Sequence, residues 1–410
     1  MTAAIIITFC VLLLIAYVFD LTSSKTKIPS VILLLLLGWS VRQLKSYFGV
    51  DIPDVSEFLP ALGTLGLILI VLEGSLELEF NKSKFILIRK SFLGALISML
   101  ALAFLFAFLF NYFGDFGWKK SLINAVPFCV ISSAIAIPSV QYLAPKLKEF
   151  VIYESSLSDI LAVLIFNFLV LNATIDLHSF GVFTLQILII IVISFFATLL
   201  LSFLLSKIEH QIKFIPIILI IILLYEISKI YHLPGLIFIL LFGLFIGNLD
   251  ELKQFKWLDR FKPEELNKEV QKFKELTVEA AFLIRALFFL LFGYLIETKE
   301  VLNTDTLFWA GLIVGAVFAF RAVQLLLSKL PLGPLIFIAP RGLITILLFV
   351  SILPSQTIWI VNKSLIIQVI LITALIMMIG LMTTKTVPKD EVGDEEGSEF
   401  TVEDSEKIES

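Results

Sequence analysis

A short acidic and hydroxyl-rich stretch opens one strongly apolar segment of the chain, Tyr153 to Val170. The stretch reads ESSLSD and carries two carboxylates, Glu154 and Asp159. Ser155 and Asp159 are four residues apart, so they share one face of a helix with 3.6 residues per turn. Glu154 and Asp159 are five residues apart and diverge by roughly 140° on the same helix. The spacing therefore predicts two polar faces with two different roles.

Asp159 is the predicted exchange site. A buried carboxyl group can hold a proton or bind a cation, but not both at once, so one aspartate can couple the two. Oxygen ligands suit a hard cation. Hydroxyl groups of Ser155, Ser158 and Ser132, with backbone carbonyls freed near Pro138, could complete the ligand shell. The alternative is a structural pair between Asp159 and an arginine.

Charged side chains at membrane depth are costly, and they mark either a pathway or a paired site. Besides the two acids above, Glu73, Arg285 and Arg341 fall deep within apolar segments. We interpret Glu154 as a structural partner of Arg341 or Arg285 rather than as a transport residue. Glu73 is either a cation-path residue or a buried hydrogen-bonding acid. Arg321 lies nearer the end of its segment, from which its side chain could extend to the interface.

Membrane helices must hold these residues in position. Of the 410 residues, 59% are hydrophobic and only 16% are charged, and the mean hydropathy is +1.01. Soluble domains average about 25% charged residues, so an aqueous fold could not bury this chain. A spanning helix needs about 20 mostly apolar residues, which predicts an all-α, polytopic membrane protein with about 13 transmembrane helices. The predicted spans cover residues 3–20, 28–46, 58–77, 85–112, 119–143, 152–173, 179–206, 212–231, 234–249, 276–297, 306–328, 331–352 and 356–384.

Lys and Arg in the loops predict the orientation of the spans. They are concentrated in the alternate loops that contain Lys25, Lys82, Lys146 and residues 253–274, so these loops are expected to be cytoplasmic. The chain is then a multi-pass protein of the inner membrane, with its N-terminus outside and its C-terminus in the cytoplasm. Residues 385–410 are acidic and lack an apolar face, which predicts a disordered cytoplasmic tail. The polar loop before the tenth span is expected to form an amphipathic surface segment.

Two segments of the chain suggest an internal repeat. IPSVILLLLLG and LPGLIFILLFG have a proline and a glycine at the same separation, Pro29 to Gly38 and Pro234 to Gly243. If spans 1–6 and 8–13 form the two repeats, their offset of seven spans gives the halves opposite orientations. Two inverted six-helix repeats are typical of secondary transporters.

The same register pairs spans 5 and 12, which both carry proline in mid-span. Span 5 contains Pro138, and span 12 contains Pro340 and Gly342. An interior proline removes a helical hydrogen bond, and the freed groups need partners from protein or water. We therefore expect helices 5 and 12 to be broken and to cross at the site; ordinary proline kinks are the alternative.

These residues resemble the monovalent cation:proton antiporter superfamily, especially the prokaryotic sodium/proton antiporters that are related to the animal sodium/proton exchangers. The helix 6 signature of that family, Glu-Ser-Leu-Leu-Asn-Asp, is similar to ESSLSD and matches Glu154, Ser155 and Asp159. PRGLITILL resembles the helix 12 motif and matches Arg341, and LEGSLEL resembles the bacterial FEGGLEL motif and matches Glu73. FLIRALFFLLFG resembles helix 10, where a basic residue often occurs in the family.

The resemblance covers about residues 1–384. It implies a transmembrane antiporter domain in a homodimer, with core helices 3–6 and 10–13 moving like an elevator against a dimer domain made from the rest. It further implies that Asp159 carries the ion and the proton and that Glu154 pairs with Arg341.

The chain departs from the family pattern at two places. Ser158 occupies the position of the family's asparagine, and Ala136-Ile137-Pro138 replaces the Thr-Asp-Pro of helix 5, so the site has fewer ligands. With a single carrier carboxylate, electroneutral exchange of a monovalent cation (Na⁺, or else Li⁺ or K⁺) for a proton is expected. The expected partners are these ions, the bilayer and a second copy of the chain.

Two other classes of function stay open from the residues alone. One is an ion channel or sensor, and the other is a transporter of an organic anion held by Arg285 and Arg341. The sequence contains no Gly-rich phosphate loop, zinc-ligand spacing or nucleophile elbow, so neither an enzyme nor a cofactor is predicted. The net charge of −4 does not suggest a nucleic-acid partner.

Overall fold

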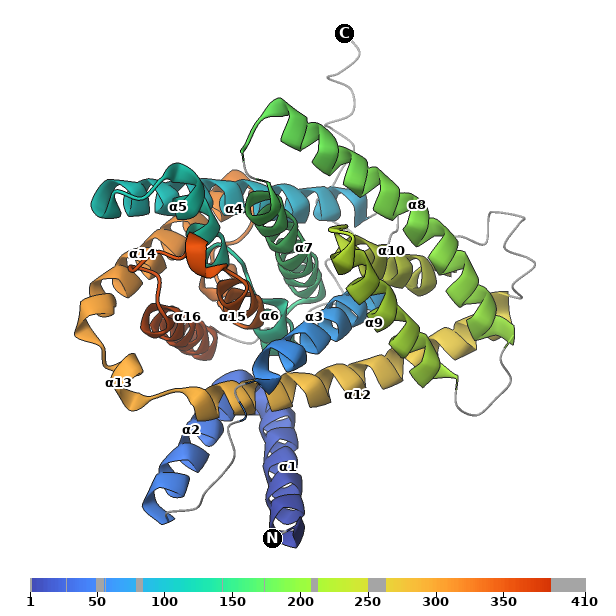
Figure 1. Ribbon diagram of the computed structural model, residues 1–410. Helices are drawn as coiled ribbons and strands as arrows, with labels where there is room; N and C mark the ends of the chain where they lie inside the picture. Colours follow the sequence, from blue (N-terminus) through green and yellow to red (C-terminus); the bar gives the residue numbers. More distant parts are fainter. Residues whose placement is uncertain are drawn as a thin grey trace.

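The protein is all-α in the computed structural model. The model describes residues 2–26, 28–48, 55, 57–78, 84–141, 143–172, 174–207, 213–249 and 263–384. Within these ranges the chain forms helices and connecting loops without a β-strand, which confirms the predicted fold class (Figure 1). The predicted acidic tail at 385–410 and residues 250–262 of the polar loop lie outside the described residues.

The helices match the predicted spans in order, and two of the spans are divided. The helices are α1 (Thr2–Thr26), α2 (Ser30–Phe48), α3 (Phe58–Glu77), α4 (Phe85–Gly114), α5 (Trp118–Ala125), η2 (Val126–Phe128), α6 (Ser133–Ser139), α7 (Pro145–Leu171), α8 (Leu177–Lys207), α9 (Phe214–Ile230), α10 (Gly235–Gly247), α12 (Pro263–Leu295), α13 (Thr298–Val301), α14 (Thr304–Leu327), η4 (Leu335–Phe337), α15 (Leu343–Val350), η5 (Pro354–Gln356) and α16 (Lys363–Thr383), where η marks a 3₁₀-helix. In the described part of the chain, nine helical segments are long and apolar enough to cross a membrane. The total of thirteen spans stays a prediction.

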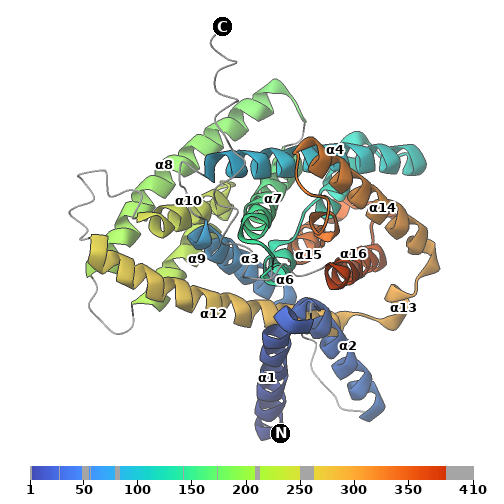
Figure 2. The ribbon, with the colours of Figure 1, turned by 180° about the vertical axis from the view of Figure 1, so that it is seen from behind.

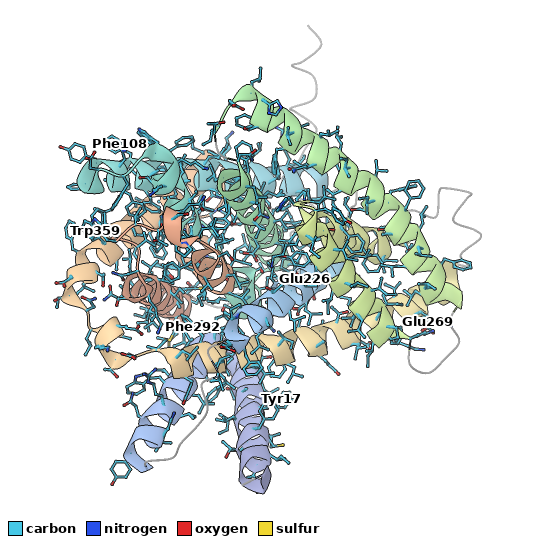
Figure 3. The ribbon with its side chains drawn as sticks, in the orientation of Figure 1. Tyr17, Phe108, Glu226, Glu269, Phe292 and Trp359 are labelled. Atoms are coloured by element: carbon cyan, nitrogen blue, oxygen red, sulfur yellow. The ribbon has the colours of Figure 1, made fainter. Side chains whose placement is uncertain are left out.

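Helix α12 includes part of the loop before the tenth span. Its 33 residues run without interruption from Pro263 to Leu295, so the charged residues from Pro263 onward are helical and continue into the predicted span. Exposed and buried positions alternate along residues 268–277, which agrees with the expected amphipathic surface segment. Figure 3 shows Glu269 near one end of α12, where α9 is close by, and Phe292 near the other end. At about 1.5 Å per residue the helix is close to 50 Å long, which exceeds the thickness of the hydrocarbon core.

Spans 5 and 12 are both broken, as expected. Span 5 unwinds after η2, and residues 129–132 are not helical before α6 begins. Span 12 unwinds after η4, and residues 338–342 are not helical before α15 begins. The two breaks meet: the backbone N–H of Ser132 donates to the carbonyl of Pro340 at 2.9 Å. The non-helical segment of one span thus provides a hydrogen-bond partner for a backbone group of the other, which lipid could not provide.

Pro138 is not at the break of span 5, contrary to the prediction. It lies near the end of the seven-residue helix α6, whereas the unwound residues precede that helix. Because Pro138 has no N–H, the short helix α6 lacks one backbone hydrogen bond there, but this does not cause the break at which the two spans cross. Pro340, in contrast, is within the non-helical segment of span 12.

Two helix contacts have the same form. Helix α2 packs closely on α12, where a Cβ on Gly38 would be 2.7 Å from the backbone nitrogen of Tyr294. Helix α10 packs on α3, where a Cβ on Gly243 would be 2.7 Å from Cβ of Ser75. Under the predicted repeat α2 corresponds to α10 and α12 to α3, so the two contacts are equivalent. The inverted repeat itself stays a prediction that these contacts favour.

The broken helices lie at the centre of the molecule, and the N-terminal helices lie at its edge. In two opposite views, α6, α7 and α15 are surrounded by α3, α4, α12, α14 and α16, while α1 and α2 project away from this group (Figures 1 and 2). In the 18-residue window taken within 118–139, 83% of the residues are buried, against 11% in the window 6–23 of α1. The polar residues of the site are therefore in the most enclosed part of the fold.

Candidate functional site

Asp159 is buried in α7, beside the start of α6. Its side chain is 1% exposed. Oδ2 accepts hydrogen bonds from the hydroxyl of Ser133 and, at 3.3 Å, from the backbone N–H of Ser133. Oδ1 is buried and has no hydrogen-bond partner among the described residues. A buried carboxylate oxygen is costly without a partner, so Oδ1 is the position at which a proton or a cation can bind.

Ser132 adds a second open oxygen at the crossing. Its Oγ is buried and has no hydrogen-bond partner within the described ranges. It precedes Ser133, which holds Asp159, and a Cβ on Gly342 of the other break would be 2.8 Å from this Oγ. A glycine at position 342 thus leaves room at the oxygen. Its position supports the predicted use of Ser132 as a ligand, which stays a prediction.

The other two predicted serine ligands make backbone contacts. Ser158 Oγ accepts a hydrogen bond from the N–H of Ile131 at 3.0 Å, so it satisfies a group that the break of span 5 has freed. The Ser155 hydroxyl donates to the carbonyl of Val151 at 2.7 Å within α7. A serine that donates to its own helix still has lone pairs for a cation. Whether Ser155 and Ser158 bind the ion stays a prediction.

Glu154 pairs with Arg321, and the predicted pair of Glu154 with Arg341 is wrong. Nη1 of Arg321, on α14, is 2.5 Å from Oε1 of Glu154, and both side chains are nearly inaccessible. Arg321 does not extend to the interface as expected, because Nε donates to the carbonyl of Leu335 at 3.1 Å in the chain that follows α14. The 3₁₀-helix η4 thus folds back over the guanidinium and buries it. Glu154 has the structural environment that was predicted, but with a different arginine.

Gln324 completes the pair one helical turn beyond Arg321. Its Nε2 donates to the same Oε1 of Glu154, and its Oε1 accepts from Arg321 Nη1 at 3.1 Å. Gly94 of α4 allows this arrangement, because a Cβ there would be 2.5 Å from Gln324 Nε2. Three side chains from α7 and α14 therefore form one buried, charge-assisted network.

Arg341 fastens the two breaks to each other. Its Nε donates to the carbonyl of Phe128 at 2.7 Å, at the end of η2, and its Nη1 donates to the carbonyl of Ala339 at 2.8 Å. Its backbone N–H donates to the hydroxyl of Thr373 on α16 at 3.1 Å. The carbonyl end of a helix carries partial negative charge, so a buried cation is stabilised there without a carboxylate. In the described part of the chain, Arg341 has no acidic partner.

Glu73 and Arg285 form a looser pair beside the centre. Arg285 Nη1 of α12 is 3.7 Å from Glu73 Oε2 of α3, and the two side chains are 10% and 15% exposed. This distance is beyond a good hydrogen bond. The pair therefore joins α3 to α12 while its carboxylate is held less firmly than that of Glu154.

Sequence reasoning missed Ser133, Gln324 and Thr373. Ser133 is adjacent to the predicted ligand Ser132, but only the position of the break shows which serine donates to Asp159. Gln324 could have been found, because a glutamine three residues after an arginine shares its helix face. Thr373 gave no signal, since one hydroxyl in an apolar span commonly bonds within its own helix, as Thr373 also does to Val369.

The donor set suits a weakly held, exchangeable cation. Among the described residues, no group of three or more His, Cys, Asp or Glu side chains could hold a metal ion. The crossing instead offers one carboxylate oxygen and one hydroxyl oxygen that find no partner in the described part of the chain. A polar centre built where two broken helices cross in an all-α membrane protein is typical of secondary transporters.

Comparison with known proteins defines the family. The family model of the transmembrane sodium/hydrogen exchangers matches residues 10–389, so the chain belongs to that family. It is thus a multi-pass membrane protein of a transporter family, not of an enzyme family. The comparison with curated proteins found no match.

Two structures of one archaeal protein have a similar fold. A structure of the sodium proton antiporter MjNhaP1 from Methanocaldococcus jannaschii at pH 8 is 18% identical, with a TM-score of 0.63, and the match covers 93% of this chain and 96% of that one. A second structure, from an electron microscopy map of the same antiporter, is 19% identical, with a TM-score of 0.66 and coverage of 92% and 95%. At this identity the likeness shows the fold alone.

Proposed function

We propose that the protein is a secondary active antiporter that exchanges a monovalent cation, Na⁺ in the first place, for a proton at Asp159. The observation that carries the proposal is a pair of buried oxygens at the crossing, Asp159 Oδ1 and Ser132 Oγ, that have no hydrogen-bond partner among the described residues. Membership of the sodium/hydrogen exchanger family supports the choice of ions.

Competition at one carboxylate supplies the coupling. Ser133 holds Oδ2 of Asp159 in both protonation states, because its N–H and hydroxyl approach the same oxygen. Oδ1, which has no partner among the described residues, then takes either a proton or a cation, and Ser132 Oγ is the candidate for a second ligand. Since a single negative charge is neutralised by either ion, the exchange is one for one and electroneutral. Li⁺ and K⁺ remain candidate substrates beside Na⁺.

Movement of the site relative to a fixed part of the protein completes the cycle. We infer an elevator-like movement in which the helices around the crossing form the core and α1, α2 and α8–α10 form the static part. The bonds of Arg341 to Phe128 and of Ser132 to Pro340 support this division, because they tie both broken helices into one unit. The large exposed apolar faces of α1 and α8 leave room for a homodimer contact in addition to lipid. An inner-membrane location with the N-terminus outside follows from the charges of the loops.

The contacts of the arginines do not favour transport of an organic anion. That alternative requires Arg285 and Arg341 to be available to a ligand. Arg285 faces Glu73 at 3.7 Å, and Arg341 donates to two backbone carbonyls. An ion channel differs from an antiporter by lacking proton coupling, so the experiment below separates the two.

Proton movement in proteoliposomes tests the proposal. The full chain is reconstituted with a pH-sensitive dye, and Na⁺, Li⁺ or K⁺ is added to wild type and to Asp159→Asn. Wild type is expected to exchange at least one cation for protons, and Asp159→Asn to exchange none. Asp305→Asn, which alters an exposed carboxylate at the start of α14, is the matched control and retains exchange. Coupled exchange that persists in Asp159→Asn would rule out the carrier role.

A further inference from the structure

Two amide side chains in apolar helices face a cavity that the exchange site does not include. Asn167 lies in the last third of α7, and Gln186 lies in the apolar first half of α8. Both line a cavity of about 250 Å³ between α7, α8 and the turn before α10. Neither side chain has a hydrogen-bond partner in the described ranges. An amide at membrane depth without a protein partner needs water or a ligand.

The cavity leads along α7 toward Asp159. A second, smaller cavity of about 20 Å³ shares Asn167 and Pro234 with the first and is also lined by Val163. Asp159, Val163 and Asn167 follow one another at intervals of four residues, so each step turns by about 40° and rises about 6 Å. Val163 is therefore one turn from the exchange site, and Asn167 is two turns from it, about 12 Å away. The two cavities follow one side of α7 from Asn167 to Val163 and end one turn from the exchange site.

The walls of the larger cavity come from two sets of helices. Phe168 of α7 packs between Phe180 and Phe183 of α8, with ring centroids 4.8 and 5.1 Å apart, and closes the cavity on one side. Helix α8 runs on from the end of α7 beside α9 and α10 (Figure 1). Under the division proposed above, α7 belongs to the moving core and α8 to the static part. The cavity thus lies at the boundary that movement of the core would open or close.

We propose that this cavity is an access site for a partly hydrated monovalent cation on its way to Asp159, with the side-chain oxygens of Asn167 and Gln186 as ligands. The inference rests on the proposed function and adds a second binding site for the same cation. Amide oxygens suit a hard cation. Among the described residues, no carboxylate lines either cavity, His232 lines the larger one and Lys229 the smaller one, so a cation is bound weakly and passes on. By the predicted orientation the cavity is on the outer side.

Thiol labelling tests the cavity without relying on transport. Asn167→Cys is made in a Cys10→Ser background and treated in proteoliposomes with a charged, water-soluble thiol reagent. The buried Cys129 is retained and sets the background. Asn167→Cys is expected to react, and Na⁺ is expected to slow the reaction, because the side-chain oxygen of Gln186 still holds the ion in the cavity. Leu185→Cys, next to Gln186 but 56% exposed on the apolar surface of α8, is the control and is expected not to react. Equal labelling of both positions, or none at Asn167→Cys, would overturn the access site.

Transport from each side tests the role of the amides. Asn167→Leu and Gln186→Leu are expected to raise KM about fivefold for a cation added on the cavity side, a ratio that corresponds to about 1 kcal/mol. KM on the opposite side and kcat stay unchanged. Asn167→Asp is expected to lower the same KM. Equal losses from both sides would mean that the amides only support the fold, which contradicts the proposal. If wild type exchanges no cation, the proposed function fails, whereas labelling and its protection by Na⁺ still decide the site.

Discussion

The two acids of α7 lie five residues apart and have opposite environments. Both are 1% exposed. Glu154 has an arginine at 2.5 Å and a glutamine on the same oxygen. Asp159 has a serine on one oxygen and no partner for the other in the described part of the chain. One helix therefore carries one carboxylate that is paired with an arginine and a glutamine and another that can still bind a proton or a cation.

The two acids are equally buried, so their hydrogen-bond partners, and not their burial, distinguish the structural acid Glu154 from the transport acid Asp159. A charge pair in a low-dielectric interior is retained only when each member is compensated. Glu154 meets that condition without any ligand, so proton or cation binding there would have to displace Arg321. Asp159 meets it only when a proton or a cation is bound. Substitutions of the two acids should therefore give opposite results.

The largest expected effect is on transport by Asp159→Asn. The amide keeps the shape and can still accept a bond from Ser133, but it can neither carry a negative charge nor exchange a proton. We expect coupled exchange to fall to the level of empty liposomes, with a melting temperature equal to that of wild type or above it. Dye-reported exchange and a thermal melt in detergent measure the two quantities. A large drop in melting temperature would show that Asp159 is also needed for folding.

Glu154→Gln should give the next largest effect, and it should appear in stability. Removing one partner of a buried pair leaves the other charge uncompensated, which costs about 3–5 kcal/mol. Arg321 would then be a buried cation with a carbonyl and a neutral amide as its partners. We expect a much lower melting temperature and a lower yield, with cation selectivity unchanged in the protein that folds.

The double variant Glu154→Gln with Arg321→Met is the control for that result. It removes the stranded charge, so it should recover a large part of the lost stability. If Glu154→Gln instead folds normally and transports nothing, Glu154 belongs to the ion pathway and the comparison of the two acids is wrong.

Ser158→Ala should have an intermediate effect, again on stability. Its hydroxyl accepts the N–H of Ile131 at the break of span 5, and an unsatisfied buried donor costs about 1–3 kcal/mol. Ser158→Asn, which restores the residue of the resembling family, supplies an acceptor again and should recover part of the loss. The melting temperature of the three proteins measures this. A change in KM without a change in melting temperature would instead make Ser158 an ion ligand.

The sequence predicted the class of fold and the helices that carry the site, because apolar length, mid-span proline and buried charge are all visible in one chain. It did not predict which arginine pairs with Glu154. Arg285, Arg321 and Arg341 are all on apolar spans, and their depth along a helix says nothing about how the helix is rotated or which segment folds back over it. The prediction for Pro138 was wrong for a related reason. A proline shows only where one helical hydrogen bond is missing. The helix unwinds where its backbone groups find partners on the other broken helix, as the N–H of Ser132 does at the carbonyl of Pro340.

Ser155→Ala should have the smallest effect, and it tests the spacing argument directly. Ser155 and Asp159 share a helix face, yet the Ser155 hydroxyl donates to Val151 within α7. Losing a bond to the carbonyl of the same helix costs little, because that carbonyl keeps its helical partner. We expect an unchanged melting temperature and, if a lone pair of Ser155 binds the cation, a KM raised by a few fold with unchanged kcat. An unchanged KM for Na⁺, Li⁺ and K⁺ would remove Ser155 from the ligand shell and leave Asp159 and Ser132 as its side-chain members.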